Sequence, residues 1–339
     1  MKSRAWVSAL LLSVVASGLV ACGPSPTMQA HDEETTSGEE TTTATTTPTG
    51  PPPSFLVTPS RVFARIDVAR IRASPVGPDI SSAIRSTESW QRYAGSSGID
   101  PIESFDAIVI GADAVYADRR TILLRHTQTD AQVRDAILRL SVARGGAPTW
   151  TEVDGLSVAA PPQTLAVPHS VVLTAEHEVV LTPSDDVARV AEVAHAQGAR
   201  RTLAVQGIDP SLAFDANEIL TAHVDEPPPR RAGWPEPPQR YDLWLTEEPS
   251  THEVMVRIHG DFDTPEHCHQ SREFLTQQAS YYASQMLVRA AGLNRPLEAL
   301  VVTEQGTALD GHTTFTIEEL RRALGAMALM QLQGGTPSM

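Results

Sequence analysis

Short strand-like runs alternate with amphipathic helical stretches from about residue 55 onward, and this alternation restricts the possible folds more than any other feature of the chain. Runs of β-branched and aliphatic residues indicate strands, and apolar residues spaced three and four apart indicate helices. The elements predicted in the first half are a strand at 62–67, a helix at 80–93, paired strands at 105–112 and 120–126, a helix begun by a capping box of Thr129 and Gln132 and ended by Gly145, a hairpin around Asp154 and Gly155, a β region at 170–182, and a helix at 184–197 ended by Gly198.

The second half repeats these parts in the same order. Its predicted elements are paired strands at 241–248 and 252–260, a helix that starts at Thr264 and ends at Gly292 with Cys268, Leu275, Ala279, Tyr282 and Met286 on one face, a hairpin formed by 297–304 and the residues before Thr316, and a last helix capped by Thr316 and Glu319 with Ile317, Leu320, Leu324 and Met327 inward.

A strand-strand-helix-hairpin-helix unit therefore occurs twice. We predict an α+β fold in which helices pack on one face of antiparallel sheets, with an internal duplication into units 55–199 and 200–333 and a flexible tail at 334–339.

A second signal favours another register between the halves. The segments GIDPIESFDA (98–107) and GIDPSLAFDA (207–216) agree at seven of ten positions, and aligning them leaves one extra strand in the second half. We take the order of elements as the guide to the fold. The two segments are then the same Asp-Pro turn that enters a strand.

The first 21 residues have the layout of a secretory signal peptide. Lys2 and Arg4 form a basic start, and a mostly apolar stretch follows at 5–20 and ends in small residues. The stretch is marginal in length for a spanning helix, which needs about 20 apolar residues. Cleavage is therefore the favoured interpretation.

The residues Leu19-Val20-Ala21-Cys22 resemble the lipobox of bacterial lipoproteins. The resemblance implies that Cys22 receives a diacylglycerol, becomes the first residue of the mature chain and is acylated further. Two or three acyl chains hold a protein stably on a bilayer, whereas one binds reversibly. Gly23 lacks the carboxylate of an inner-membrane retention signal, which favours the outer membrane of a bacterial cell envelope. The alternative is an ordinary signal peptide with a chance cysteine.

Residues 22–54 are predicted to form the lipidated cysteine and a disordered tether. They are rich in Thr, Glu and Pro and nearly devoid of large apolar side chains, so they cannot bury enough surface to offset the loss of chain entropy on ordering.

Composition excludes several kinds of chemistry. Lys2 is the only lysine, so the mature chain has no P-loop lysine, no Schiff-base lysine and no S-x-x-K acyl-enzyme motif. A formal net charge of −15 disfavours nucleic acid as a partner. Once Cys22 carries lipid, only Cys268 remains, and we interpret it as a small buried residue. No cofactor-binding motif occurs, and no cofactor is predicted.

Two segments are candidate sites of weak specificity. The stretch HGDFDTPEHCH gathers metal-ligating residue types, but side chains two positions apart on a helix point in different directions, so exposed histidines at a capped helix start are the favoured interpretation. The metal candidates are His259, Asp261, Asp263, His267 and His269. The loop 225–240 has six prolines, and its partner-binding candidates are Arg230, Arg231 and Trp234.

The favoured function is a lipid-anchored, non-catalytic envelope protein that presents the duplicated α+β module for binding or structural roles. Its partners would be the membrane, through the lipid, and an envelope protein or polymer. The alternative is an exported hydrolase or metal-binding protein whose site assembles only in the fold. In overall layout the chain resembles lipoproteins of GC-rich Gram-negative bacteria, a likeness that implies no activity.

Overall fold

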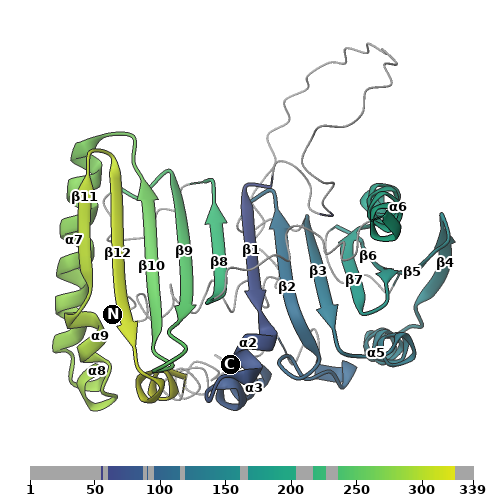
Figure 1. Ribbon diagram of the computed structural model, residues 1–339, viewed down its shortest axis with the longest axis horizontal. Helices are drawn as coiled ribbons and strands as arrows, with labels where there is room; N and C mark the ends of the chain where they lie inside the picture. Colours follow the sequence, from purple (N-terminus) through teal and green to yellow (C-terminus); the bar gives the residue numbers. More distant parts are fainter. Residues whose placement is uncertain are drawn as a thin grey trace, which may run out of the picture.

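The computed structural model describes residues 55, 60–86, 90, 95–114, 119–160, 167–203, 217–226 and 236–324, without the side chains of 197–203 and 287. Twelve strands form one antiparallel sheet in the order β11-β12-β10-β9-β8-β1-β2-β3-β7-β6-β5-β4 (Figure 1). The strands are β1 (Val62–Asp67), β2 (Phe105–Ala112), β3 (Arg120–His126), β4 (Thr149–Val153), β5 (Leu156–Ala160), β6 (His169–Ala175), β7 (Glu178–Pro183), β8 (Glu218–Val224), β9 (Arg240–Glu247), β10 (Val254–Asp261), β11 (Val301–Gln305) and β12 (Ala308–Phe315).

The helices lie between these strands in the chain. They are α2 (Val68–Ala73), α3 (Gly77–Ser86), α5 (Asp130–Ala143), α6 (Val187–Leu203), α7 (Pro265–Ser284), α8 (Met286–Ala290) and α9 (Asn294–Glu298), with short 3₁₀ turns at Gly95–Ser97 (η1) and Ser184–Asp186 (η2). Residues 317–324 form a further helical segment. The predicted α+β class is therefore confirmed.

The two halves of the chain have matching strand orders. β1-β2-β3-β7-β6 in the first half corresponds to β8-β9-β10-β12-β11 in the second, with α5 and α7 at equivalent points of the chain. The halves meet where β1 and β8 pair antiparallel, with Ala64 opposite Ala222. The β4–β5 hairpin lengthens the first half alone. The boundary expected at 199/200 lies inside α6.

Most local predictions agree with the structure. The strands at 62–67, 105–112 and 120–126 have the predicted bounds, and the last two pair as expected. Both predicted capping boxes form, because Thr129 and Gln132, and Thr316 and Glu319, each exchange two hydrogen bonds.

Several expectations differ from the structure. The helix expected from residue 80 begins at Gly77, and residues 297–298 of the expected hairpin belong to α9. β8 is the strand that follows the segment at 207–216, and no bounds were predicted for it. Its short apolar run precedes the proline-rich loop, and its neighbours in the sheet are β9, the next strand of the chain, and β1, which lies far away in the chain. α6 continues through Gly198, although glycine costs roughly 1 kcal/mol in a helix interior. α7 ends at Ser284, because Gln285 is extended, and this break leaves Met286 80% exposed rather than on the inner face.

The helices cover both faces of the sheet in the first half. One face carries Ile108, Ile110 and Leu124, which pack with α2 and with residues near α5. The opposite face carries Ala107, Val109 and Leu123, which pack with Phe55 and with Val187, Val190 and Val193 of α6.

The expectation that helices pack on one face therefore holds for α2, α5 and α7 but not for α6. The reason is in β2, where residues 107–112 are buried on both sides of the strand. Apolar residues that point to both faces need cover on both faces. In the second half, α7 packs on the face that holds Val256 and Leu309, the same face as α2 and α5.

Candidate functional site

One face of the sheet in the second half is not covered by any helix in the described ranges. Along β10, buried Val254 and Val256 alternate with exposed Met255 and Arg257. The same alternation along β12 leaves every second residue in contact with solvent. We call this surface the open face, and its main residues are His223, Asp242, Trp244, Met255, Arg257, His259, Asp261, Asp310 and His312.

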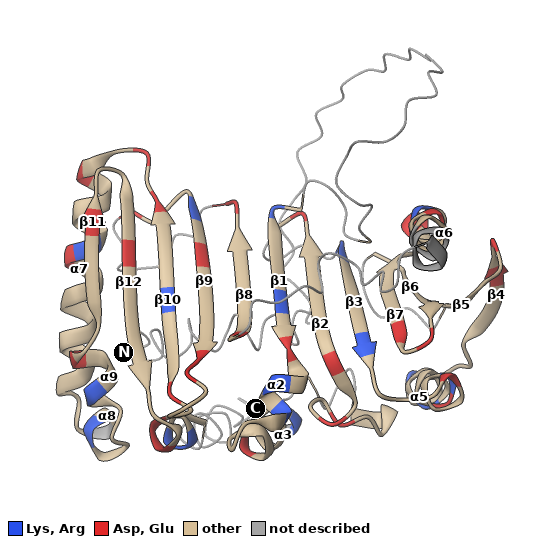
Figure 2. Cartoon of the chain, viewed as in Figure 1, with Lys and Arg blue, Asp and Glu red and all other residues tan. Residues whose placement is uncertain are grey.

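Acidic and basic residues lie on neighbouring strands of the open face, with β12 and β9 on either side of β10. Figure 2 shows acidic bands on β12 and β9 and basic bands on β10 and β1. The basic residue on β1, Arg65, makes a two-pronged ion pair with Glu218 at 2.6 and 2.7 Å. Such an arrangement presents hydrogen-bond donors and acceptors at the regular spacing of a β-sheet.

Histidine and aspartate residues form a row across four neighbouring strands. His223, Asp242, His259 and Asp310 stand opposite one another in the register of β8, β9, β10 and β12. The His223 Nδ1 lies 2.6 Å from an Asp242 oxygen, and the His259 Nδ1 lies 2.9 Å from an Asp310 oxygen. The row therefore consists of two cross-strand His-Asp pairs.

His259 has a carboxylate near each ring nitrogen, since its Nε2 lies 3.4 Å from Asp261. Partial burial alone would lower the pKa of His259, but the hydrogen bond and charge of Asp310 and the charge of Asp261 raise it above its ordinary value. Burial would raise the pKa of Asp261, but its contacts with Arg240 and with His259 lower it. Both shifts favour the charged forms.

A second row contains the aromatic residue of the open face. The Arg257 guanidinium lies over the Trp244 ring, 5.6 Å from its centroid, and His312 stands opposite Arg257 on β12. Met255, 39% exposed, adds an apolar contact on the same strand. The open face thus combines charge, aromatic and apolar surface, the mixture common at sites that bind other molecules.

The sequence predicted most of the strands that form the open face. Of the residues on this face, only His259 and Asp261 were named as candidates. The alternation along 241–248 and 252–260 was a usable signal for residues such as Trp244. His223 and Asp310 join the set only through strand pairing, across 19 and 51 residues of chain.

The five metal candidates do not come together. His267 pairs with Asp263 at 2.6 Å, His269 pairs with Glu304 at 3.1 Å, and His259 pairs with Asp310 and Asp261 as described above. In the described ranges, no group of three or more His, Cys, Asp or Glu residues is arranged to hold a metal ion. Each histidine is instead held by carboxylates of its own.

Cys268 is fully buried and donates its thiol hydrogen to the Ala308 carbonyl oxygen at 3.3 Å, and burial raises the pKa of this thiol. These observations confirm the prediction of a small buried residue. Cys22, Arg230, Arg231 and Trp234 lie outside the described residues.

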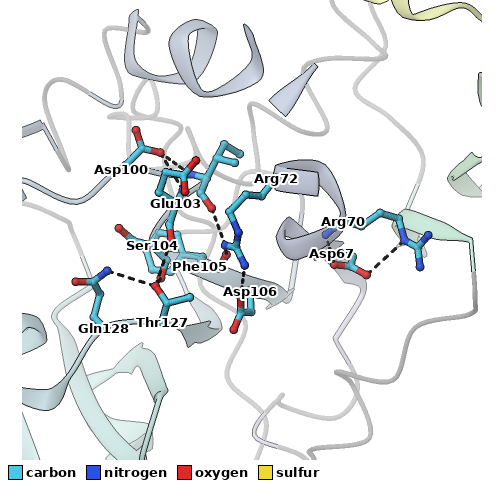
Figure 3. A network of polar contacts seen from close by, with 11 residues as sticks. Asp67, Arg70, Arg72, Asp100, Glu103, Ser104, Phe105, Asp106, Thr127 and Gln128 are labelled. Atoms are coloured by element: carbon cyan, nitrogen blue, oxygen red, sulfur yellow. Dashed lines mark hydrogen bonds and ion pairs between the residues drawn. The ribbon is translucent and has the colours of Figure 1, made fainter. Parts of the chain in front are cut away.

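The first of the two matched decapeptides forms a polar network beside β2 (Figure 3). Asp100 accepts hydrogen bonds from the backbone N–H groups of Ile102 and Glu103 at 2.9 and 3.0 Å. Arg72 of α2 donates to the Phe105 carbonyl oxygen at 2.8 Å and to Asp106 at 2.6 Å. These contacts fix the turn against α2, so this part of the repeat is structural.

Two hollows lie away from the open face. One, of about 340 Å³, is bounded by α7, α8 and α9 and is lined by Ala279, Ala283, Arg289 and Leu297 among others. The other, of about 50 Å³, lies at the start of β3. Among the described helices, none has both the length and the hydrophobicity that crossing a bilayer requires.

Comparison with known proteins gives no family and no close relative. No family model matches the chain, and no curated protein matches it. Crystal form I of TP0453 is 10% identical with a TM-score of 0.41, and the match covers 80% of this chain and 96% of that one. Crystal form IV is 11% identical with a TM-score of 0.42, covering 81% and 95%. At these values the function has to be argued from this chain's own residues.

Proposed function

We propose that the chain is a lipid-anchored, non-catalytic protein of the bacterial cell envelope that binds an envelope protein or polymer through the open face. The lipobox at Cys22 supports the anchor, and Gly23 favours the outer membrane. The tether at 22–54 would let the folded part reach a partner at a distance from the membrane.

The observation that carries the binding role is the difference between the two halves. In the first half, α6 and Phe55 cover the face that holds Val109 and Leu123. In the second half, the same side of the sheet exposes Arg257, Asp310 and His312. Open faces are common on antiparallel sheets, but here charged pairs, an aromatic ring and an exposed methionine occupy one such face together.

The alternative of an exported hydrolase or metal-binding protein has less support. Catalysis favours a recess that excludes water around converging groups, and both described hollows lie away from the His-Asp pairs. His223 and His259 each contact an aspartate, but no hydrogen bond in the described ranges joins either ring to a serine, threonine or cysteine that could act as a nucleophile.

The anchor is tested by the intact mass of the protein from the membrane fraction, beside a Cys22→Ser variant. We expect a chain that begins at Cys22 with added acyl mass, and a variant that loses both this mass and membrane association. An unmodified wild-type chain, or one that retains residues 1–21, would contradict the proposal.

The open face is tested by crosslinking in intact envelopes. We compare wild type with Arg257→Glu, which reverses a charge at the centre of the open face, and with Arg125→Glu, which makes the same change at an exposed position of β3 in the first half. Loss of the same crosslinked partner from Arg257→Glu alone is the expected result. Equal capture by all three proteins would exclude the open face as the binding surface.

A further inference from the structure

Arg120, the first residue of β3, is a buried cation without a partner in the described part of the chain. The residue is 7% exposed, and its Nε is shielded from solvent and forms no hydrogen bond. The described ranges contain no ion pair to its guanidinium. Arginine keeps its proton at any pH at which proteins are folded, so it cannot reduce the cost of burial by becoming neutral.

Arg120 is one of the residues that line the smaller hollow, at the end of the sheet where β2, β3 and β7 meet. This hollow has a volume of about 50 Å³ and is also lined by Ser60, Gly111, Ala112, Asp113, Arg119, Thr121, Pro183 and Asp186. A single water needs roughly 10 to 15 Å³ of such space, so the hollow has room for a small polyatomic ion but not for a molecule with rings.

The carboxylates nearby do not neutralise Arg120. Asp186 is taken by Arg119, whose Nη2 lies 3.0 Å from it, while Nη1 of Arg119 lies 2.7 Å from Asp185. Asp113 is exposed, and no salt bridge joins it to Arg120. Among the described residues, the guanidinium of Arg120 therefore has no ion-pair partner, although the carboxylates of Asp113 and Asp186 also line the hollow.

We propose that this hollow binds a small oxyanion, held by the guanidinium of Arg120. A guanidinium group matches two oxygens of one phosphate or carboxylate group with parallel N–H donors, and such charge-assisted bonds are stronger than hydrogen bonds between neutral groups. The ligand is a free inorganic oxyanion or a small carboxylate. The binding site lies outside the open face and does not depend on the function proposed for it.

The test measures the thermal midpoint, Tm, of the full mature chain in detergent. Sodium phosphate and sodium acetate are each added at neutral pH and compared with sodium chloride at equal ionic strength. An anion that binds only the folded state raises Tm, by roughly 5 °C or more at a 100-fold excess over Kd for a domain of this size. A response to phosphate alone assigns a tetrahedral anion, and a response to acetate assigns a carboxylate.

Arg120→Met removes the charge and keeps much of the side-chain volume. We expect it to abolish the response, whereas Arg125→Met, a matched change at an exposed position of the same strand, retains it. Figure 2 shows basic residues at both ends of β3, which makes this comparison possible within one strand. In chloride alone, Arg120→Met should be at least as stable as wild type, since a buried unpaired charge is lost.

A further variant distinguishes the anion from an internal partner. Asp113→Asn removes a negative charge near the hollow, so it should strengthen the response to the anion. If Asp113 instead forms an ion pair with Arg120, this variant will be less stable than wild type in chloride, and its Tm will not rise further when the anion is added. Wild type that responds equally to chloride, phosphate and acetate would overturn the proposal, even if Arg120→Met fails to fold.

Discussion

His259 of β10 and Asp310 of β12 face each other across two paired strands, with the histidine Nδ1 2.9 Å from a carboxylate oxygen. Asp261 lies 3.4 Å from the other ring nitrogen. Both ring nitrogens of His259 therefore face carboxylates, and the pKa of this histidine is raised. The two contacts make the stability of the open face dependent on pH.

The first prediction concerns this pH dependence. The pKa of His259 is raised in the folded state. Its contribution to the free energy of unfolding is therefore fully present below the pKa that this histidine has in the unfolded chain, near 6.5, and is lost as pH rises through its folded-state pKa. His259→Gln should therefore lower the free energy of unfolding by about 0.5–1 kcal/mol near pH 5.5 and by less near pH 8.5. Urea unfolding at both pH values measures the difference. His312→Gln, on the same face opposite Arg257, is the control, and an equal pH trend in both variants would contradict the assignment.

The second prediction concerns Asp100. Burial alone would raise its pKa, but hydrogen bonds from the backbone of Glu103 and Ile102 and from Ser81 lower it below its ordinary value. Asp100→Ala leaves one partly buried and one exposed N–H group without their acceptor and should cost about 1–3 kcal/mol in the free energy of unfolding. Asp100→Asn keeps one acceptor oxygen and should cost less.

The pH dependence of Asp100 has the opposite sign to that of His259. Because the pKa of Asp100 is lowered in the folded state, its ionised carboxylate stabilises the fold at pH values above 3.8, the pKa in the unfolded chain. This stability is lost as pH falls through the folded-state pKa. The destabilisation by Asp100→Ala should therefore shrink in acid. Denaturant unfolding at neutral pH and near pH 3 measures it, and a constant difference would argue against an ionised Asp100.

The third prediction concerns Phe55, the first residue that the structure describes. Its side chain is 1% exposed and packs with α6, and its carbonyl oxygen accepts a hydrogen bond from Arg189 at 2.8 Å. Phe55→Ala should lower the free energy of unfolding by about 3–5 kcal/mol. Met255→Ala, at an exposed position, should change it little. A small effect of Phe55→Ala would mean that residue 55 belongs to the tether.

The fourth prediction concerns the two helix caps. Thr129 and Thr316 each accept a hydrogen bond from a backbone N–H three residues later, at 3.3 Å in both cases. Thr129→Ala and Thr316→Ala should each cost about 1 kcal/mol, and the serine variants should retain most of this stability because the hydroxyl remains. Thermal unfolding compares the four variants. If serine is no better than alanine, the hydroxyl does not act as a cap.

The sequence by itself determined the elements whose causes are local. The capping boxes at Thr129 and Thr316 depend on residues three positions apart, and the strand at 105–112 is apolar from Ala107 to Ala112. The order of elements also indicated the duplication, and the burial of Cys268 followed from its small apolar character. In each case the interacting residues lie within a few positions of one another, or the property belongs to one side chain.

The tertiary structure alone decided which of these elements meet. The pairing of β1 with β8, the packing of α6 on the opposite face from α5, and the row from His223 to Asp310 all join residues far apart in the chain. Arg120 appeared in the sequence as one residue of an ordinary strand, and only the packing around it buries this residue with no ion-pair partner among the described residues. Such relationships depend on strand register and on which face is covered, and these are set by the summed burial of the whole sheet rather than by any short segment.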